Sequence, residues 1–457
     1  GHFPEVRRQL RDSQLEAVQF ALARGGRALL ADEMGLGKTF TSLVLMQQFS
    51  EEWPLLVVAP KSVVLNWRAE VEKWLPHLAG ETQALSEGPC RLDPRAVIVV
   101  ASYDQVTRKP HLQVRADGKP YETVIIDEAH YLKAPDTARA SQIRPICQRA
   151  RRCVLLSGTP VLNGAAEAWS LLAALVPQRC GSFADFCGRY SELDVSTGEP
   201  RQVGVRHPQE LHLLMKSLML RRRKHSVLPQ LQTKTRIQKS IRLDQVDQRY
   251  LREIASLRQR STRMTGSIAP QLYSITAKAK AAVVADYVES LLQAEEKFVV
   301  FAHHHKLLDA VQRRLKALGT GHVRVDGKVG QEARHNLVAR FQGDPEVRVA
   351  IMAITAAGQG ISLTAGRVAV FAELHWVPGK LLQAEDRVHR AGQNRSVEIH
   401  YLVIEGNVFL DQKLLGLLKK KGGFVDSIME GEEAEAPFSG SLPSRPFRSD
   451  GQMTRPR

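Results

Sequence analysis

The stretch "LLADEMGLGKTFTS", Leu29 to Ser42, contains residues whose types and spacing could bind a nucleotide. In the Walker A pattern G-x-x-x-x-G-K-[ST], backbone amides surround the phosphates, while the lysine and the hydroxyl reach the γ-phosphate and Mg²⁺. Gly37, Lys38 and Thr39 match the end of this pattern, but Asp32 stands where the first glycine belongs. Two interpretations follow: a phosphate loop with one variant residue, or a glycine-containing turn before a surface helix.

The segment "VIIDEAH" supplies carboxylates for the same chemistry. Asp127 can hold Mg²⁺, and Glu128 can orient and deprotonate the water that attacks the γ-phosphate of ATP. An isolated D-E-x-H pattern could also be a solvated surface. Its position after a buried apolar run, downstream of Lys38, favours ATP hydrolysis with Mg²⁺ as the cofactor.

The segment "LLQAEDRVHRAGQ" (381–393) offers a candidate for charge stabilisation. Its spacing predicts Arg387 and Arg390 on one helical face, with Gln383 one turn earlier. An arginine usually meets the charge that spreads over a transferred phosphoryl group. We expect the two arginines to complete, from a second unit, a nucleotide site in the cleft between two units. The alternative is a solvated or DNA-facing helix.

Length and composition limit the fold and the partner. A chain of 457 residues with 43% apolar and 25% charged side chains predicts two globular units. Its 64 Lys and Arg against 48 Asp and Glu give a net charge of +16, which favours nucleic acid over a membrane surface, although a basic solvated surface is the alternative. The five cysteines show no metal-ligand spacing, which predicts reduced thiols in an intracellular protein. No membrane span or signal peptide is expected, and a first residue of Gly1 rather than Met predicts an excised piece.

Short apolar runs alternate with segments of helical period, a pattern that predicts parallel sheets flanked by helices. The expected strands are 28–31, 55–60, 96–103, 123–128 and 152–158 in a first sheet, and 297–303, 322–327, 348–354, 368–374 and 399–405 in a second. Between the two series, from about Ala165 to Ala282, helices rich in Arg and Lys are expected in place of strands. The strand, loop and helix expected around Lys38 favour the phosphate-loop interpretation.

The order of the motifs resembles that of the Snf2 family of helicase-like ATPases within superfamily 2. The matching segments are "LRDSQLEAV", "DEMGLGKT", "LLVVAPKSVVLNWRAEVEKW", "DEAH", "LLSGTPVLN", "MLRRRKHSVLPQL", "ITAAGQGISLTAG" and "QAEDRVHRAGQ". The segment "FVVFAHHHKLLD" is most similar to the HARP-type annealing-helicase and fork-remodelling branch. In this family Asp is usual at position 32, so the variant residue belongs to the loop.

The resemblance implies an α/β fold of two RecA-like lobes with Snf2-type helical insertions between them. Lobe 1 is expected at residues 1–225 with a helical protrusion at about 165–225, lobe 2 at 226–425 with a helical insertion at about 244–282, and a flexible tail at 426–457.

Further site roles follow from the resemblance. Gln14 would read the adenine edge, although from the residues alone it is a capping or surface residue. The nucleotide contacts implied are Asp32, Gly35, Gly37, Lys38, Thr39 and Gly360, with Thr39 and Asp127 on Mg²⁺. The DNA contacts implied are Lys61, Ser102, Thr159, His303, Thr355, Gly358 and Gln359. The run His303 to His305 predicts the end of a strand near DNA rather than a metal site, because three adjacent side chains cannot all face one ion.

The implied activity is that of an ATP-dependent translocase on double-stranded and forked DNA, which remodels or anneals structures such as stalled forks. A monomer is expected, and a single-strand-binding protein or a sliding clamp would bind only through regions absent from this sequence. The expected location is the nucleus of a eukaryote, or the cytoplasm or nucleoid of a bacterium. A chromatin remodeller with the same ATPase and a superfamily 2 RNA helicase are the alternatives, and a non-catalytic DNA-binding scaffold is disfavoured by the complete set of catalytic residue types.

Overall fold

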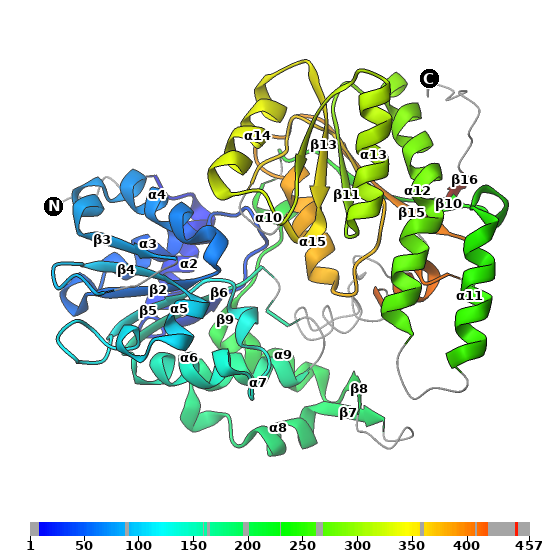
Figure 1. Ribbon diagram of the computed structural model, residues 1–457. Helices are drawn as coiled ribbons and strands as arrows, with labels where there is room; N and C mark the ends of the chain where they lie inside the picture. The colour runs from blue at the N-terminus through cyan, green and yellow to red at the C-terminus, as the bar shows by residue number, and fades with distance from the viewer. Residues whose placement is uncertain are drawn as a thin grey trace. The chain divides into compact units, whose positions relative to one another are not determined.

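A computed structural model describes residues 9–86, 91–158, 160–161, 165–194, 201–228, 230–261, 268–356, 361–406, 409–418 and 444–446 (Figure 1). These residues form two compact units, one up to Leu228 and the other from Gln230 to Leu418 together with Ser444–Pro446. Within the described residues each unit contains one parallel seven-stranded sheet, which confirms the predicted α/β class. No helix in this part of the chain is long and apolar enough to cross a membrane.

The sheet of the first unit has the strand order β3-β4-β2-β5-β6-β1-β9. Its strands are β1 (Arg27–Leu30), β2 (Leu55–Ala59), β3 (Thr82–Leu85), β4 (Ile98–Ser102), β5 (Thr123–Ile126), β6 (Arg152–Leu156) and β9 (Met219–Leu220). Every strand predicted for this sheet forms, whereas the two edge strands, β3 and β9, were not predicted. The central strands are apolar apart from polar residues at their ends, because helices cover both faces of the sheet.

Alternate residues of the central strands pack into two separate cores. Leu30 and Val57 lie in the core that includes α2 (Asp12–Leu22), α3 (Lys38–Gln47) and α4 (Val64–Trp74). Leu29 and Val58 lie in the core of the opposite face. The helices of that core are α5 (Tyr103–Arg108), α6 (Ala138–Arg149), α7 (Ala165–Leu175), α8 (Phe183–Tyr190) and α9 (Pro208–Leu218). The two cores cover the two faces of the sheet and so fix the carboxyl ends of its strands, where the candidate site begins.

The sheet of the second unit has the strand order β12-β13-β11-β14-β15-β10-β16. Its strands are β10 (Lys234–Ile241), β11 (Phe298–Ala302), β12 (Gly321–Val325), β13 (Val347–Ala353), β14 (Val368–Phe371), β15 (Val397–Ile404) and β16 (Ser444–Pro446). The helices of this unit are α11 (Gln248–Ser261), α12 (Ala269–Ala294), α13 (His305–Ala317), α14 (Gln331–Gly343) and α15 (Pro378–Val388). All strands predicted for this sheet form, and β16 lies within the tail that was expected to be flexible.

The prediction that strands are absent from 165–282 was wrong. The antiparallel pair β7 (Ser191–Asp194) and β8 (Arg201–Val205) lies there, and β10 pairs with β15 along its whole length. The Lys and Arg of β10 obscured its strand character in the sequence. Two of these charges are compensated by acids on α15, which the sequence places far away: Glu385 Oε2 lies 2.8 Å from Lys234 Nζ and 2.6 Å from Arg236 Nη2, and Asp386 Oδ1 lies 4.0 Å from Lys234 Nζ.

Helix α15 also ends earlier than predicted. It stops at Val388, so Arg387 lies in its last turn and Arg390 lies beyond it, and the two arginines do not share one helical face. His389 leaves the helical conformation with φ −97° and ψ 84°. Its Nε2 lies 2.7 Å from the carbonyl oxygen of Gln232, a contact that holds the side chain where the helix ends.

Replacing Glu385 with Gln should destabilise the second unit. The side chain is buried, and although burial alone would raise its pKa, Arg236 and Lys234 hold the pKa of Glu385 well below its ordinary value. The neutral variant removes the acid nearest to both cations and leaves only Asp386, at 4.0 Å from Lys234, so we expect a loss of about 3 kcal/mol in the free energy of unfolding. Chemical denaturation monitored by circular dichroism measures this loss.

The matched control is Asp244→Asn in the same unit, which breaks the exposed ion pair between Arg242 and Asp244. A change of about 0.5 kcal/mol or less is expected there. Equal losses in the two variants would contradict a stabilising role for Glu385.

Candidate active site

The loop between β1 and α3 needs glycine at its end. Gly35 and Gly37 have φ of +84° and +87°, a conformation that side chains disfavour. A Cβ atom on Gly37 would lie 2.4 Å from Gln14 Nε2 and 3.3 Å from Arg11 Nη2. The backbone of Gly37 therefore passes close to α2 and begins α3, and the N-terminus of such a helix favours an anion.

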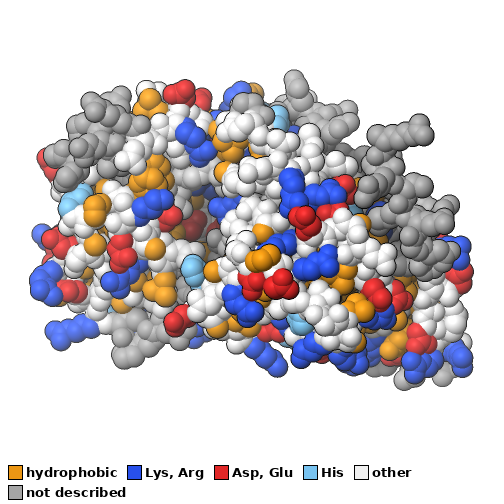
Figure 2. All heavy atoms as spheres, turned by 90° about the horizontal axis from the view of Figure 1, so that it is seen from above, with side chains coloured by type: hydrophobic (Ala, Val, Ile, Leu, Met, Phe, Trp, Pro, Cys, Tyr) orange, Lys and Arg blue, Asp and Glu red, His pale blue; other side chains and the backbone are white. Residues whose placement is uncertain are grey.

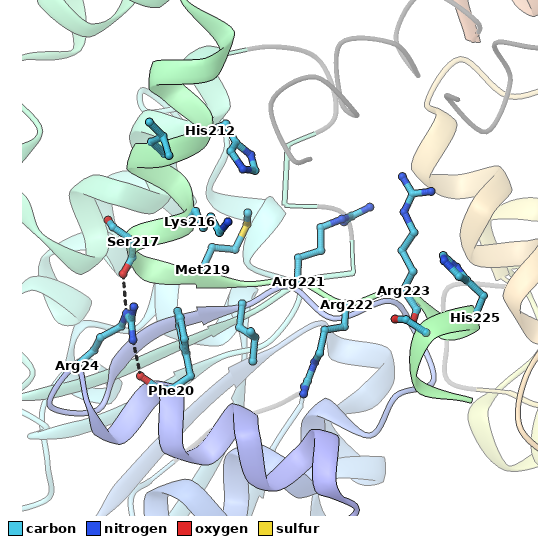
Figure 3. A pocket seen from close by; sticks show the side chains of 13 residues that line it. Phe20, Arg24, His212, Lys216, Ser217, Met219, Arg221, Arg222, Arg223 and His225 are labelled. Carbon is cyan, nitrogen blue, oxygen red and sulfur yellow. Dashed lines mark hydrogen bonds between the residues drawn. The ribbon is translucent and has the colours of Figure 1, made fainter. Parts of the chain in front are cut away.

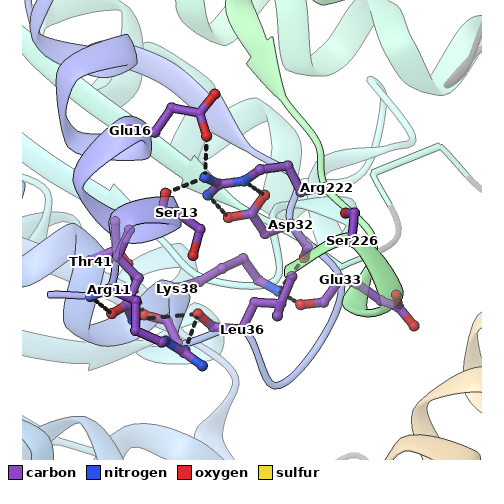
Figure 4. Close-up of polar contacts among 12 residues, drawn as sticks. Arg11, Ser13, Glu16, Asp32, Glu33, Leu36, Lys38, Thr41, Arg222 and Ser226 are labelled. Atoms are coloured by element: carbon purple, nitrogen blue, oxygen red, sulfur yellow. Dashed lines mark hydrogen bonds and ion pairs between the residues drawn. The ribbon is translucent and has the colours of Figure 1, made fainter. Parts of the chain in front are cut away.

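Lys38 lies across this loop. Its Nζ donates to the carbonyl oxygen of Asp32 at 2.6 Å and to that of Glu33 at 3.4 Å (Figure 4). The ammonium is thus held on the concave side of the loop by neutral acceptors. A phosphate group placed in the loop would offer it charged oxygens, which make stronger hydrogen bonds than carbonyls do.

The side chain of Asp32 binds Arg222. This ion pair gives a structural reason for an aspartate at the position where the Walker A pattern has its first glycine. Arg222 Nε lies 3.0 Å from Asp32 Oδ1, and Nη2 lies 2.5 Å from Oδ2. Arg222 also donates to the carbonyl oxygen of Ser13 and to Glu16 on α2 (Figure 4). In the sequence, Arg222 was only one member of a basic segment. The carboxylate at position 32 therefore connects the loop to a residue 190 positions away.

Arg11 and Gln14, from the segment "LRDSQLEAV", hold the other side of the phosphate loop. Arg11 Nη2 donates to the carbonyl oxygen of Leu36 at 3.0 Å, and Gln14 Nε2 donates to the same atom at 3.4 Å. Gln14 Oε1 accepts from the Arg11 backbone N–H at 3.0 Å, which caps α2. The capping interpretation of Gln14 is confirmed, and its contact with adenine stays a prediction.

Asp127 follows β5 and is held by two donors. Its Oδ2 accepts from the indole Nε1 of Trp67 at 2.8 Å, and its Oδ1 accepts from the Glu128 backbone N–H at 2.9 Å. Burial, and then the charge of Glu128, raise the pKa of Asp127 to about 6, whereas Trp67 and Lys38 act in the opposite direction. Because β1 and β5 are strands of one parallel sheet, the phosphate loop and Asp127 both lie at the carboxyl ends of its strands.

Glu128 has a left-handed backbone, with φ 50° and ψ 52°. This conformation is uncommon for a residue other than glycine, costs about 1 kcal/mol or more, and is found mostly at functional sites. Glu128 Oε2 lies 3.1 Å from His130 Nδ1, and His130 Nδ1 lies 3.4 Å from Ser157 Oγ. The hydroxyl of Tyr103 donates to the carbonyl oxygen of Asp127 at 2.8 Å and helps to fix this turn. The structure therefore brings the predicted acid pair together with the histidine of the same motif.

The predicted DNA-contacting residues of the first unit have different surroundings. Lys61 begins a short 3₁₀ helix (Lys61–Val63) directly after β2 and is exposed. Ser102 is buried, and its Oγ accepts from the Gln105 backbone N–H at 3.3 Å to cap α5. Thr159 lies outside the described residues. The DNA contacts of all three stay predictions.

In the second unit, Thr355 is exposed and His303 is partly buried at the end of β11. The backbone N–H groups of His303 and His304 both donate to Glu373 Oε2 at 2.8 Å. No cluster of three metal-ligating side chains occurs in the described parts of the chain. The predicted contacts at Gly358, Gln359 and Gly360 lie outside those parts.

The two arginines predicted to stabilise charge lie at the end of α15 in the second unit. Arg390 Nη1 donates to the carbonyl oxygen of Ile361 at 3.2 Å, and burial lowers the pKa of Arg390 while Asp386 opposes this effect. The carbonyl oxygen of Arg387 accepts from the Leu363 backbone N–H at 2.8 Å. Both arginines thus contact the segment that includes Ile361 and Leu363, in the motif "ITAAGQGISLTAG". Their role toward ATP stays a prediction.

Comparison with known proteins gives two matches to protein-family models. The model described as SNF2-related domain matches residues 13–296, and the model described as helicase conserved C-terminal domain matches residues 279–392.

The chain is also similar to curated proteins. It is 37% identical over 446 residues to the DNA annealing helicase and endonuclease ZRANB3 of Homo sapiens, with 94% of this chain and 41% of that protein covered. It is 35% identical to the SWI/SNF-related matrix-associated actin-dependent regulator of chromatin subfamily A-like protein 1 of Xenopus tropicalis, with 95% of this chain and 46% of that protein covered. The chain thus spans less than half the length of these two relatives.

The raised pKa of Asp127 predicts a pH dependence of Mg²⁺-nucleotide binding. A carboxylate must be ionised to hold a cation, and the ionised fraction of Asp127 falls as the pH decreases through about 6. We expect binding to weaken over that window. In Trp67→Phe, which lacks the N–H donor that lowers this pKa, the midpoint should move to higher pH.

Calorimetric titration of Mg²⁺ and ATP at several pH values measures this midpoint. The control is Trp169→Phe, because Trp169 Nε1 donates to the carbonyl oxygen of Gly181, away from the acids. An identical midpoint in the wild type and in both variants would show that Trp67 does not influence Asp127.

Proposed function

The chain belongs to the SNF2-related family, and from this membership we propose that it is an ATP-dependent translocase on double-stranded and branched DNA. It would remodel or anneal structures such as stalled replication forks. The observation that supports this proposal most strongly is the site of the first unit, where the phosphate loop with Lys38 follows β1 and the acid pair Asp127 and Glu128 follows β5, both at the carboxyl ends of strands in one parallel sheet. A DNA-binding protein without hydrolysis would not need a strained acid beside a phosphate loop.

The residues present fit an ATP site. The left-handed glycines leave the loop backbone accessible, and the start of α3 favours negative charge. Lys38 would bind the terminal phosphates, and Thr39 and Asp127 would hold Mg²⁺, which when bound neutralises part of the phosphate charge. Glu128 would orient the attacking water and accept its proton. Asp127, held by two donors, would keep its carboxylate in place during this step.

The net charge of the chain and the names of its relatives support DNA as the nucleic acid that it binds. The net charge of +16 favours a polyanion, and the human relative is named as a DNA annealing helicase and endonuclease. On the face shown in Figure 2, Lys and Arg lie interspersed with Asp and Glu rather than in one continuous patch. We therefore propose binding through separate phosphate contacts, with Lys61 and Thr355 among them. Such contacts read no sequence and weaken as salt increases.

Chromatin remodelling is the second candidate function, because the Xenopus tropicalis relative is named as a regulator of chromatin. ATP hydrolysis with single-stranded, duplex, forked and nucleosomal DNA and with RNA separates the candidates. We expect duplex and forked DNA to stimulate hydrolysis most. Greater stimulation by nucleosomes than by their naked DNA would favour a remodeller, and stimulation by RNA alone would exclude the proposal.

Two substitutions should separate nucleotide binding from hydrolysis. Lys38→Ala removes the ammonium on the phosphate loop, so both ATP affinity and turnover should fall. Glu128→Gln removes only the proton acceptor, so ATP should still bind while turnover is lost. Equilibrium ATP binding and steady-state hydrolysis at saturating DNA measure these effects. Wild-type turnover in Glu128→Gln would rule out the proposed base.

The arginines of the second unit provide a further test. Arg390→Ala should lower DNA-stimulated hydrolysis on the order of 10³-fold, the effect expected of an arginine that stabilises a phosphoryl transition state, while ATP and DNA still bind. Arg387→Ala should behave similarly. The control is Arg340→Ala, on the exposed side of α14, which should leave hydrolysis unchanged. Near wild-type turnover of Arg390→Ala would exclude a role of this arginine in hydrolysis, and loss of both binding and turnover would make it structural.

A further inference from the structure

A basic pocket with a volume of about 650 Å³ lies in the first unit, beside the edge strand β9 (Figure 3). We call it the edge pocket. Its walls come from α2, α9 and the segment from β9 to α10 (Lys224–Val227). Its charged or titratable lining residues are Arg24, His212, Lys216, Arg221, Arg222, Arg223 and His225, and none of its described lining residues is acidic. The proposed ATP chemistry uses none of these residues.

The lining favours a phosphate group over an apolar ligand. Arg24 donates to the carbonyl oxygens of Ser217 at 2.6 Å and of Phe20 at 2.9 Å, so it fixes the wall between α2 and α9. Lys216 and His225 are exposed and can approach a ligand. Lys and Arg are the usual donors to phosphate oxygens in nucleic-acid complexes.

The segment that forms one wall of the edge pocket also holds the phosphate loop. Figure 3 shows the Arg222 side chain pointing away from that of Arg223. On that other side, Arg222 makes its two hydrogen bonds with Asp32 (Figure 4). The Glu33 backbone N–H donates to the carbonyl oxygen of Arg222 at 2.9 Å, and the Lys224 backbone N–H donates to Glu33 Oε2 at 2.6 Å.

We propose that the edge pocket binds phosphate groups of a nucleic-acid backbone, and that Arg222 transmits this binding to the phosphate loop. The route begins at Arg222 in the pocket wall and has two contacts: Arg222 binds the carboxylate of Asp32, and the carbonyl oxygen of Asp32 accepts from Lys38. A displacement of Arg222 therefore changes the position of the lysine that would bind ATP. The inference deepens the proposed function, on which it rests, by adding a DNA contact and a positioning residue.

Coupling of this kind is reciprocal. If bound DNA changes the affinity of the protein for ATP, then bound ATP changes its affinity for DNA by the same factor. The edge pocket lies within one unit, so the coupling does not depend on the arrangement of the two units. It acts on the binding of ATP through Lys38, whereas Arg387 and Arg390 are proposed to act on hydrolysis. A change in ATP binding through Lys38 should therefore appear in KM, and a change in hydrolysis through the arginines should appear in kcat.

The first experiment tests the site with matched charge reversals in the full chain. Lys216→Glu changes an exposed cation in the edge pocket, and Lys119→Glu makes the same change at an exposed position of the same unit outside it. Binding of a short duplex is measured against salt. Log affinity falls as log salt rises, and Lys216→Glu should make this fall shallower by about 1, the effect of one lost phosphate contact. Lys119→Glu should leave the steepness unchanged. Equal slopes in the two variants would overturn the site.

Competitors identify the chemistry of the ligand. Short duplex DNA should protect Lys216 from acetylation at concentrations where inorganic phosphate and polyglutamate do not. Protection by inorganic phosphate at the same concentration would assign the pocket to free phosphate, and protection by polyglutamate alone would assign it to an acidic peptide. Either result would overturn the proposal of a nucleic-acid backbone.

The second experiment tests the positioning role of Arg222. Saturating duplex DNA should lower the KM for ATP several-fold in the wild type. In Arg222→Gln, DNA should no longer change KM even at concentrations that saturate DNA binding, because no guanidinium reaches Asp32. Arg222→Lys should restore part of the response, which a merely structural defect would not show. A full response of KM in Arg222→Gln would overturn the coupling.

The failure of the inference and that of the proposed function are distinguishable. A wild-type chain whose hydrolysis does not respond to DNA would contradict the proposed function and the coupling together. A DNA-stimulated wild type, combined with a Lys216→Glu variant that equals Lys119→Glu, would contradict the edge pocket alone.

Discussion

The ion pair between Asp32 and Arg222 holds the phosphate loop in place, and the geometry of the candidate site depends on it. An almost buried carboxylate is unfavourable without a partner, and removing one member of such a pair costs about 3–5 kcal/mol. Arg222 satisfies both carboxylate oxygens of Asp32 and also reaches α2. The backbone of Asp32 is then fixed where its carbonyl oxygen accepts from Lys38. A glycine at position 32 would keep the usual phosphate-loop sequence but would lose this connection.

The two neighbouring acids of the site differ in what constrains them. Asp127 is constrained through its side chain, since an indole and a backbone N–H each bind one of its oxygens. Glu128 is constrained through its backbone, which is left-handed, while His130 lies beside its carboxylate. A cation ligand must be held in one position, whereas a proton acceptor must face the water. The division suits the roles of metal ligand and base that we propose for the two residues.

The sequence predicted the central strands and the residue types of the site because both depend on local patterns. Strands buried on both faces, such as β2 and β5, are continuous apolar runs, and the glycines around Lys38 carry a short motif. It did not predict β10, in which Lys234 and Arg236 pair with Glu385, nor the partners Trp67 and Arg222. These contacts join residues that lie far apart in the chain, and no spacing within a motif indicates them. The end of α15 was missed for the same reason, since His389 contacts the carbonyl oxygen of Gln232.

The central proposal is that hydrolysis of ATP moves this chain along double-stranded DNA. Displacement of a third strand from a triplex on otherwise duplex DNA measures such movement directly, because no base pair of the duplex has to open. With the wild-type chain, the third strand should be released in the presence of ATP and Mg²⁺ and retained with ADP. DNA-stimulated hydrolysis without any release of the third strand would contradict translocation and leave only a DNA-dependent ATPase.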